Sequence, residues 1–294
     1  MANILITGGT GLVGKRLTAF LIKKKHTIRV LSRNPSSKNE YKWDVPNNYI
    51  DEGALHNLDY IIHLAGAGIA DKRWTAERKK VIIDSRVATA NLLFSKIKTL
   101  KIPLKGFISA SGSNYYGAKT TDTIYTETDN AGNDFLGKVC LQWENAAYQF
   151  NDLKIPVTLL RTGIVLSKKG GALQKMKTPI ISPLGSGKQY LSWIHLDDLC
   201  NLYIHAIEQN MTGVFNAVAP NFQTSKSFSK ILAKSIKRPY LPIAVPEFLL
   251  KLVFGELAVI LLEGSRLSSK KITATSFQFE FKTASEAFTN LFQK

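Results

Sequence analysis

The segment TGGTGLVG, residues 7–14, constrains the fold more than any other part of the sequence. It follows a short β-type run directly and opens a stretch whose apolar residues recur at helical spacing. In such a strand–turn–helix unit, Gly8 permits the tight turn, Gly11 lets the backbone approach a pyrophosphate, and Gly14 lets the helix pack against the sheet. The helix N-terminus then faces the phosphate charge. We therefore predict a dinucleotide site, with a ligand-free glycine turn as the alternative. The predicted site contains Gly8, Thr10, Gly11, Leu12, Val13 and Gly14.

Short β-type runs alternate with amphipathic helical stretches through the first two-thirds of the chain. This alternation is typical of a parallel sheet that is covered by helices on both faces. The candidate strands are 3–7, 27–32, 59–64, 104–110, 157–162, 190–196 and 213–218. The candidate helices of this part are 13–24, 85–97 and 139–150. The pattern predicts an α/β fold built on a doubly wound parallel sheet.

The composition of the sequence changes after Thr162, where glycines and prolines become frequent. We predict a dinucleotide-binding domain over 1–166, to which residues 190–219 return. Residues 167–189 and 220–294 are expected to form a small, mostly helical cap. The cleft between the two parts is the expected substrate site.

The chain has 294 residues and a formal net charge of +17, which favours binding to anions. Its lysines and arginines lie in separate segments, however, and no aromatic stripe accompanies them. This arrangement argues against a dedicated nucleic-acid surface. An anionic cofactor or an anionic small-molecule substrate explains part of the charge equally well.

The apolar residues and cysteines indicate where the protein is found. No uncharged apolar run long enough to span a membrane occurs, because Lys251 and Glu256 interrupt the most apolar stretch, 248–262. The N-terminus lacks the features of a secretory signal, so we expect a cytoplasmic protein. Cys140 and Cys200 have no CxxC partner, which predicts free, buried thiols.

The end of the second candidate strand indicates which dinucleotide is bound. NAD-dependent proteins usually place an acidic residue there to bind the ribose hydroxyls, whereas this chain has Ser32 and Arg33. An arginine suits the 2′-phosphate of NADP(H). We therefore predict a preference for NADP(H) over NAD(H), with a plain surface arginine as the alternative.

Further motifs are distributed along the chain. They are HLAG (63–66), GIADKRWT (68–75), DSR (84–86), SASGSNYYG (109–117), LRTGIVLS (160–167), GGALQKM (170–176), GSGKQYLSWIHLDDL (185–199) and GVFNAVAP (213–220). Together with the glycine segment they resemble the extended short-chain dehydrogenase/reductases. The combination is similar to an atypical, nucleotide-sugar epimerase-like subgroup called epimerase family proteins. The resemblance covers nearly the whole chain, and the C-terminal segment is matched loosely.

The resemblance implies a Rossmann domain that holds NADP(H) and a small C-terminal substrate domain. It places Trp43 and Asp44 beside the adenine. The backbone of Leu64, Ala65 and Gly66 is expected to lie along the cofactor. Arg161, at the end of a later strand, is also assigned to the cofactor site, although contact with a ligand and bracing of the domain interface both stay open.

The family's usual proton relay is incomplete in this sequence. Its members pair a tyrosine with a lysine four residues later, and the lysine holds the ribose and lowers the pKa of the tyrosine. Lys138, followed by Glu144, fits the lysine position, but Asp134 occupies the tyrosine position. A carboxylate beside a lysine stays ionised at neutral pH and cannot donate the proton that a ketone reduction requires.

Two other phenols, Tyr115 and Tyr116, follow the serine-rich end of a strand. We place Ser111, Tyr116 and Lys138 as the catalytic residues, with Lys138 also binding the cofactor ribose. The alternative is that the tyrosine pair only packs in the core.

Several polar residues near the expected cleft have both a functional and a structural explanation. Arg73, Trp74 and Arg86 hold a planar or acidic substrate or brace the domain interface, and both readings stay open. The basic loop at 185–189 suits an anionic group, and solvation of the loop explains it equally well. His63 ends a buried strand and is expected to be a core residue.

The HLDDL segment, 195–199, contains residue types that ligate metals. The resemblance places this segment between the domains, where we expect an aspartate to cap the next helix and no metal to bind.

The leading hypothesis is an NADP(H)-dependent oxidoreductase or epimerase-like enzyme that acts on an anionic small molecule. The alternative is an NADP(H)-binding protein with little turnover that acts as a redox sensor or regulator. The absent tyrosine favours the alternative, and the presence of Lys138 and Ser111 favours the enzyme.

Overall fold

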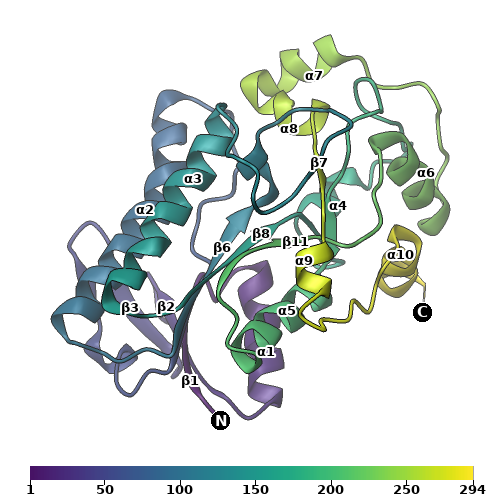
Figure 1. The fold of residues 1–294 in the computed structure, drawn as a ribbon. Helices are drawn as coiled ribbons and strands as arrows, with labels where there is room; N and C mark the ends of the chain where they lie inside the picture. Colours follow the sequence, from purple (N-terminus) through teal and green to yellow (C-terminus); the bar gives the residue numbers. More distant parts are fainter. Residues whose placement is uncertain (294) are drawn as a thin grey trace.

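The computed structural model describes residues 1–293, and an eight-stranded sheet forms its centre (Figure 1). The strand order is β11-β8-β6-β5-β1-β2-β3-β4, and all neighbours are parallel except β3 and β4. The bounds are β1 (Asn3–Thr7), β2 (Thr27–Ser32), β3 (Glu40–Asp44), β4 (Tyr49–Ile50), β5 (Tyr60–His63), β6 (Gly106–Gly112), β8 (Val157–Thr162) and β11 (Gly213–Ala217). The strand order reverses between β1 and β5, as in a Rossmann-type sheet, so the predicted fold class is confirmed.

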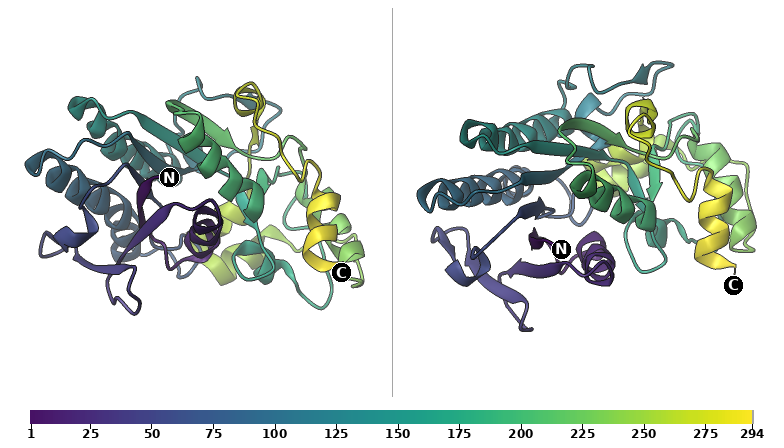
Figure 2. Two further views of the ribbon diagram at one scale, coloured as in Figure 1. Left: turned by 90° about the horizontal axis from the view of Figure 1, so that it is seen from below. Right: turned by 60° about the horizontal axis from the view of Figure 1, so that its bottom comes forward.

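Two helices cover each face of the sheet (Figure 2). The four helices are α1 (Leu12–Lys23), α2 (Ala76–Thr99), α3 (Phe135–Tyr148) and α5 (Leu196–Glu208). Ile4 and Ile6 of β1 pack with α1 and α5, whereas Leu5 packs with α2 and α3. Because both faces of β1 are fully buried, the strand is a continuous apolar run rather than an alternating one. Each such side chain contributes about 1.5–3 kcal/mol of burial free energy.

The remaining elements are short. The helices are α4 (Ala172–Met176), α6 (Ser225–Ser235), α7 (Glu247–Phe254), α8 (Val259–Leu262), α9 (Lys270–Thr273) and α10 (Ala284–Phe292). The 3₁₀ turns are η1 (Glu52–Ala54), η2 (Ser113–Tyr116), η3 (Gln149–Leu153) and η4 (Gly255–Ala258). Two small parallel sheets pair β9 (Ile164–Leu166) with β10 (Trp193–His195), and β7 (Ile124–Tyr125) with β12 (Arg266–Leu267).

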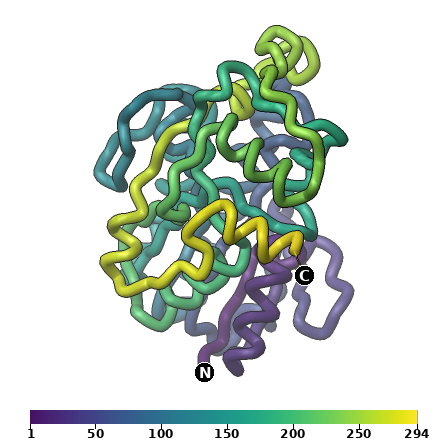
Figure 3. Tube along the Cα trace, turned by 90° about the vertical axis from the view of Figure 1, so that its right-hand side faces the viewer, coloured from purple at the N-terminus to yellow at the C-terminus, as the bar shows by residue number. Residues whose placement is uncertain are grey.

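A second hydrophobic core lies among these C-terminal elements. Phe228 of α6 packs edge-to-face on Phe288 of α10, with ring centroids 5.0 Å apart. Figure 3 shows α6 in green and α10 in yellow beside each other. Trp193 of β10 is buried in the same core, which explains why the candidate strand at 190–196 lies outside the main sheet.

Two helices begin earlier than their apolar spacing predicts. The candidate helix at 85–97 is the interior of α2, which starts after Thr75, whose hydroxyl accepts a hydrogen bond from the Arg78 N–H. Likewise, α3 starts at Phe135 rather than at 139. The first turn of α2 carries polar residues, so apolar periodicity does not reveal it. The first turn of α3 contains the buried Leu136 and Gly137.

The HLDDL segment follows β10 and forms the start of α5. The N-cap of this helix is His195, whose Nδ1 accepts from the Asp197 N–H, so the prediction of an aspartate cap is wrong. The buried Asp198 instead accepts from the N–H groups of Glu280 and Phe281. Within residues 1–293, no cluster of three or more acidic, histidine or cysteine side chains could hold a metal ion.

Cys140 and Cys200 are free and buried, as predicted. Over the same residues 1–293, no helix is both long enough and apolar enough to cross a membrane.

Candidate functional site

The glycine segment forms a tight cradle between β1 and α1. Gly8 has a positive φ of 68°, and a Cβ there would lie 2.8 Å from the Leu64 carbonyl group. A Cβ on Gly14 would lie 2.4 Å from the Gly8 carbonyl oxygen, so only glycine lets α1 approach the turn this closely. A Cβ on Gly11 would meet only that same oxygen, at 3.2 Å. That contact is tight, but Gly11 itself is exposed, so a ligand can approach its backbone.

The N-terminus of α1 offers unpaired hydrogen-bond donors to this space. The N-cap residue Gly11 has no side chain, and the first turn carries no acidic residue. The first N–H groups of the helix therefore lack a side-chain acceptor. Thr10 and Gly11 are exposed, while Leu12 and Val13 are partly exposed. The predicted cofactor residues of this segment lie together around one anion-binding helix end.

The carboxyl end of β5 is fixed against the cradle by one hydroxyl group. The Oγ1 atom of Thr7 accepts from the N–H groups of Leu64 and Ala65, at 3.2 Å each, and donates to Nδ1 of His63 at 2.8 Å. Nε2 of His63 lies 3.4 Å from the Arg86 carbonyl oxygen. Burial lowers the pKa of His63 to about 4, so the ring is neutral at pH 7. His63 is a core residue with partners for both nitrogens, as predicted, and it helps to position the exposed backbone at Gly66.

The ends of β2 and β3 lie on the other side of β1. Arg33 is exposed, and among the described residues its side chain has no ion-pair partner within 4.0 Å. Ser32 is partly buried, and its hydroxyl accepts a hydrogen bond from the Asn34 N–H at 3.3 Å. Trp43 is only 6% exposed and packs in the core, so a cofactor contact at this position is limited to its backbone. Asp44 is partly exposed and accepts from the Asn47 amide at 2.9 Å.

A buried polar network links β6, α3, β8 and β11. We call it the Glu144–Arg161 network, and its members are Ser111, Tyr116, Glu144, Arg161 and Asn216. Arg161 forms a two-point ion pair with Glu144, at 2.8 and 2.9 Å. Ser111 donates to Glu144 at 2.7 Å, and Tyr116 accepts from Arg161 at 2.9 Å while donating to Asn216 at 2.7 Å. Each side chain therefore finds its partner inside the protein.

The network contains two of the three predicted catalytic residues. Ser111 and Tyr116 are 3% and 4% exposed, and both hydroxyl groups already have protein partners. Burial raises the pKa of Tyr116 to about 12. The adjacent Tyr115 is partly exposed, and its ring centroid lies 3.2 Å from Cζ of Arg161. The catalytic roles of Ser111 and Tyr116 stay predictions, and their bonding favours a positioning role.

Asp134, at the tyrosine position of the family motif, is the N-cap of α3. Its carboxylate accepts from the N–H groups of Gly137 at 2.8 Å and Ala118 at 2.5 Å. An aspartate directly before an apolar periodic stretch is a helix-start signal, whereas the sequence analysis placed Asp134 only at the tyrosine position of the family motif. Lys138 lies one turn into the helix and is exposed, and over residues 1–293 its ammonium group has no ion-pair partner. Lys138 is thus accessible to a ligand, whereas Asp134 is committed to the backbone.

Residues at the start of α2 contact the C-terminal elements. Arg73 donates to the carbonyl oxygen of Leu252 in α7 at 2.6 Å, and Trp74 shares a hydrophobic cluster with Phe254 and Leu257 of the C-terminal elements. These contacts support the bracing role for both residues. Arg86 differs, because its guanidinium is buried and lies next to Gly66.

The basic loop at 185–189 is fixed at one end. Gln189 is fully buried and donates to the carbonyl oxygens of Leu184 and Leu261, whereas Lys188 is exposed.

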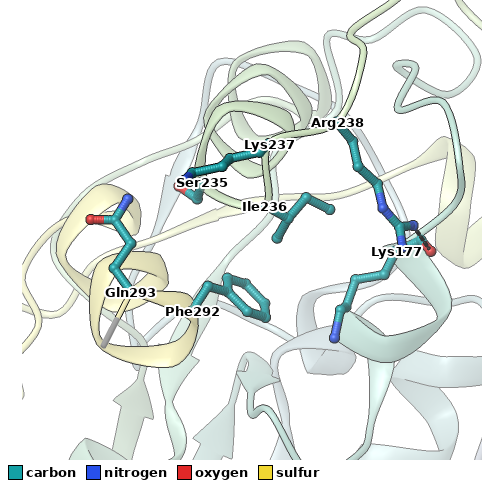
Figure 4. Close-up of a pocket in the computed structure, with 7 residues that line it drawn as sticks. All are labelled: Lys177, Ser235, Ile236, Lys237, Arg238, Phe292 and Gln293. Atoms are coloured by element: carbon teal, nitrogen blue, oxygen red, sulfur yellow. Dashed lines mark hydrogen bonds between the residues drawn. The ribbon is translucent and has the colours of Figure 1, made fainter.

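A surface hollow lies between α4, α6 and α10 (Figure 4). Arg238 donates to the carbonyl oxygen of Thr178 at 2.6 Å, and the ammonium of Lys177 lies 5.0 Å from the ring centroid of Phe292. None of its lining residues belongs to the cradle, to β5 or to α3. The basic groups here are occupied by the protein's own carbonyl and aromatic groups, so the hollow is separate from the candidate cofactor site.

Comparison with known proteins identifies the family. Residues 4–217 match the model of the NAD dependent epimerase/dehydratase family, and residues 245–291 match a domain of unknown function, DUF1731. An epimerase family protein of Mycobacterium bovis is 35% identical over 297 residues, which cover 98% of this chain and 97% of the relative.

Two solved structures are similar over nearly the whole chain. The human epimerase family protein SDR39U1, solved with NADPH, is 30% identical with a TM-score of 0.90, and the match covers 99% of both chains. A nucleoside-diphosphate sugar epimerase from Corynebacterium glutamicum is 29% identical with a TM-score of 0.80, covering 99% of this chain and 58% of that one. Because the family match, the sheet order and the glycine cradle agree, this chain belongs to the NAD dependent epimerase/dehydratase family, within the atypical short-chain dehydrogenase/reductases called epimerase family proteins.

Proposed function

We propose that this protein is an NADP(H)-dependent oxidoreductase or epimerase-like enzyme that acts on an anionic small molecule. The open cradle carries the proposal: Gly11 is exposed, and within residues 1–293 the first N–H groups of α1 have no side-chain acceptor. These donors and the positive end of the helix dipole fit a pyrophosphate. The similarity to a human protein solved with NADPH supports the same cofactor.

The preference for NADP(H) rests on the end of β2. Arg33 is exposed and free of ion pairs within residues 1–293, and the last residue of β2 is Ser32 rather than an acid. A guanidinium binds a 2′-phosphate with charge-assisted hydrogen bonds. The nearest acid on the next strand, Asp44, already accepts from Asn47.

Lys138 is proposed to hold the cofactor ribose, because it is exposed one turn into α3. NADP(H), when bound, would supply the hydride chemistry. Ser111 and Tyr116 are proposed to act through the Glu144–Arg161 network, which ties α3 to β6 and β8 and so positions Lys138. Tyr115 is partly exposed beside this network and follows the serine-rich end of β6, and we propose it as the proton donor to the substrate.

A second function is favoured by one specific observation. Asp134 caps α3 where the family's usual tyrosine would stand, and the predicted substitutes Ser111 and Tyr116 are buried. A protein with this arrangement can bind NADP(H) with little turnover and act as a redox sensor.

Isotope transfer separates the two functions. NADPH carrying deuterium on its nicotinamide is incubated with the protein and a metabolite extract, and products are examined by mass spectrometry. An enzyme transfers the label to a carbonyl compound, and Lys138→Met abolishes the transfer, while Lys23→Met at the exposed C-terminal end of α1 does not. Tight NADPH binding with no label in any product would contradict an enzyme that reduces a carbonyl substrate and would favour the sensor.

A further inference from the structure

Arg86 and Arg161 are both buried, at 6% and 3% exposure, but their surroundings differ. Arg161 pairs with Glu144 at two points. The Arg86 guanidinium uses only Nη1, which donates to the Ile82 carbonyl oxygen at 2.8 Å and contacts Oγ of Ser85 at 3.5 Å. No carboxylate within residues 1–293 forms an ion pair with it. An unpaired buried charge is costly, so a folded protein retains one only where it serves a purpose.

The groups packed around Arg86 do not supply the missing anion. Both oxygens of Glu144 are bound to Arg161, and burial raises the pKa of the neighbouring Cys140 to about 12, so its thiol is neutral. Arg78 adds a second positive charge nearby. Burial lowers the pKa of Arg86 to about 10, which leaves it protonated at pH 7.

The guanidinium lies on the ring of Trp143, with Cζ 4.9 Å from the ring centroid. The indole N–H of Trp143 is also buried without an acceptor among the described residues. Two adjacent side chains thus provide donors, and no protein acceptor satisfies them.

Gly66 packs closely against the guanidinium. A Cβ on Gly66 would lie 3.0 Å from Cζ and 3.2 Å from Nη2 of Arg86, so any other residue would press on this group. Gly66 itself is exposed and follows β5 at the switch point beside the cradle. The N–H of Ala67 donates to Ser85 at 2.9 Å, which holds this segment against α2.

We propose that Arg86 binds a carboxylate group of the substrate through its Nε and Nη2 atoms, beside the exposed Gly66. These two atoms form no hydrogen bond within the described residues, and they are the parallel pair of donors that matches the two oxygens of a carboxylate. The inference rests on the proposed function, because it names the substrate class for the same site. It assigns Arg86 to substrate binding rather than to bracing of the fold.

The test compares the carboxylate response of matched variants by thermal unfolding. Wild type, Arg86→Met, Arg86→Lys and Lys80→Met, an exposed lysine of α2, are titrated with acetate, pyruvate, malonate, inorganic phosphate and the neutral analogue acetamide, with and without NADPH. The Tm of wild type and Lys80→Met should rise with at least one carboxylate and not with acetamide. Arg86→Met should lose this rise, and Arg86→Lys should need at least tenfold more carboxylate.

Without ligand, Arg86→Met should unfold at the wild-type Tm or above it, because the substitution removes an unpaired buried charge. A large fall in Tm or failure of Arg86→Met to fold would show a structural role and overturn the proposal. An equal carboxylate response in Arg86→Lys and wild type, a response to phosphate alone, or no response to any carboxylate would also overturn it. NADPH binding is measured in the same samples, so a failure of the proposed cofactor function is seen separately from a failure at Arg86.

Discussion

The two halves of the sheet's carboxyl edge are built in opposite ways. Around β1, the cradle at residues 7–14 leaves helix donors without side-chain acceptors and Gly11 exposed. Around β6 and β8, the Glu144–Arg161 network joins each polar side chain to another and excludes water. We call these the open half and the closed half. The difference teaches that hydrogen-bond donors without a protein acceptor indicate where a ligand is expected, whereas donors with a protein acceptor stabilise the fold.

The two buried arginines differ in the same way. Arg161 belongs to the closed half, where Glu144 neutralises it. Arg86 lies between the halves and has no such partner among the described residues.

The largest expected effect tests the closed half. Arg161→Met leaves the Glu144 carboxylate buried and unpaired, so we expect the free energy of unfolding to fall by about 3–5 kcal/mol. Urea unfolding followed by circular dichroism measures it. The double variant Arg161→Met/Glu144→Leu should recover part of the loss, because no buried charge remains. A loss below about 1 kcal/mol for the single variant is typical of exposed ion pairs. It would contradict the claim that the ion pair of the closed half stabilises the fold as a buried pair.

Lowering the pH should reduce the free energy of unfolding through His63, at the carboxyl end of β5. Burial lowers the pKa of His63 from 6.5 to about 4, so between these values the unfolded chain binds a proton that the native protein does not. Stability from this residue is therefore complete above pH 6.5 and is lost as the pH falls towards 4, by about 3 kcal/mol in total. Unfolding free energies measured across this range, with His63→Gln to remove the titration, check the prediction. His56→Gln, at an exposed site, is the control. If the unfolding free energy of His63→Gln changes with pH as steeply as that of wild type, the prediction is contradicted.

A methyl group in the open half should disturb the cradle. The Cβ of Gly14→Ala would lie 2.4 Å from the Gly8 carbonyl oxygen, so we expect a loss of about 1–3 kcal/mol in stability and weaker NADPH binding. Thermal unfolding and NADPH titration measure the two effects. Gly170→Ala is the matched control, because its Cβ would meet only Leu12, at an ordinary 3.6 Å. Equal behaviour of the two variants would show that the close approach of α1 is unimportant.

The smallest expected effect sharpens the description of the open half. Arg33→Ala should weaken NADPH binding about tenfold, or about 1.4 kcal/mol, and leave NADH binding unchanged, because only NADPH carries the 2′-phosphate. Fluorescence titration with both cofactors measures it, with the exposed Lys38→Ala as the control. An equal loss for both cofactors would exclude a role in phosphate recognition.

Local signals in the sequence predicted the strands of both halves and the turn of the open half. Strands 3–7 and 27–32, and strand 157–162 of the closed half, have their predicted bounds, and the glycine spacing predicted the turn between β1 and α1. These features depend on neighbouring residues, whose periodicity and turn chemistry are visible along the chain.

The closed half could not be predicted in the same way. Tyr116 and Asn216 are 100 positions apart, and Glu144 and Arg161 are 17 apart, so no local pattern announces their contacts. Sequence reasoning therefore treated Tyr116 as a candidate acid when its hydroxyl is already bonded in the core. The cap role of Asp134 could have been predicted, because an aspartate directly before an apolar periodic stretch is a helix-start signal.

The most direct test of the account is a side-by-side titration of the wild-type protein with NADPH and NADH, followed by energy transfer from tryptophan to the reduced nicotinamide. The account predicts saturable binding of NADPH at a lower concentration than NADH, because the cradle binds the pyrophosphate of both and Arg33 adds the 2′-phosphate of one. Binding of neither cofactor would contradict the claim that the uncovered donors of the open half mark a ligand site.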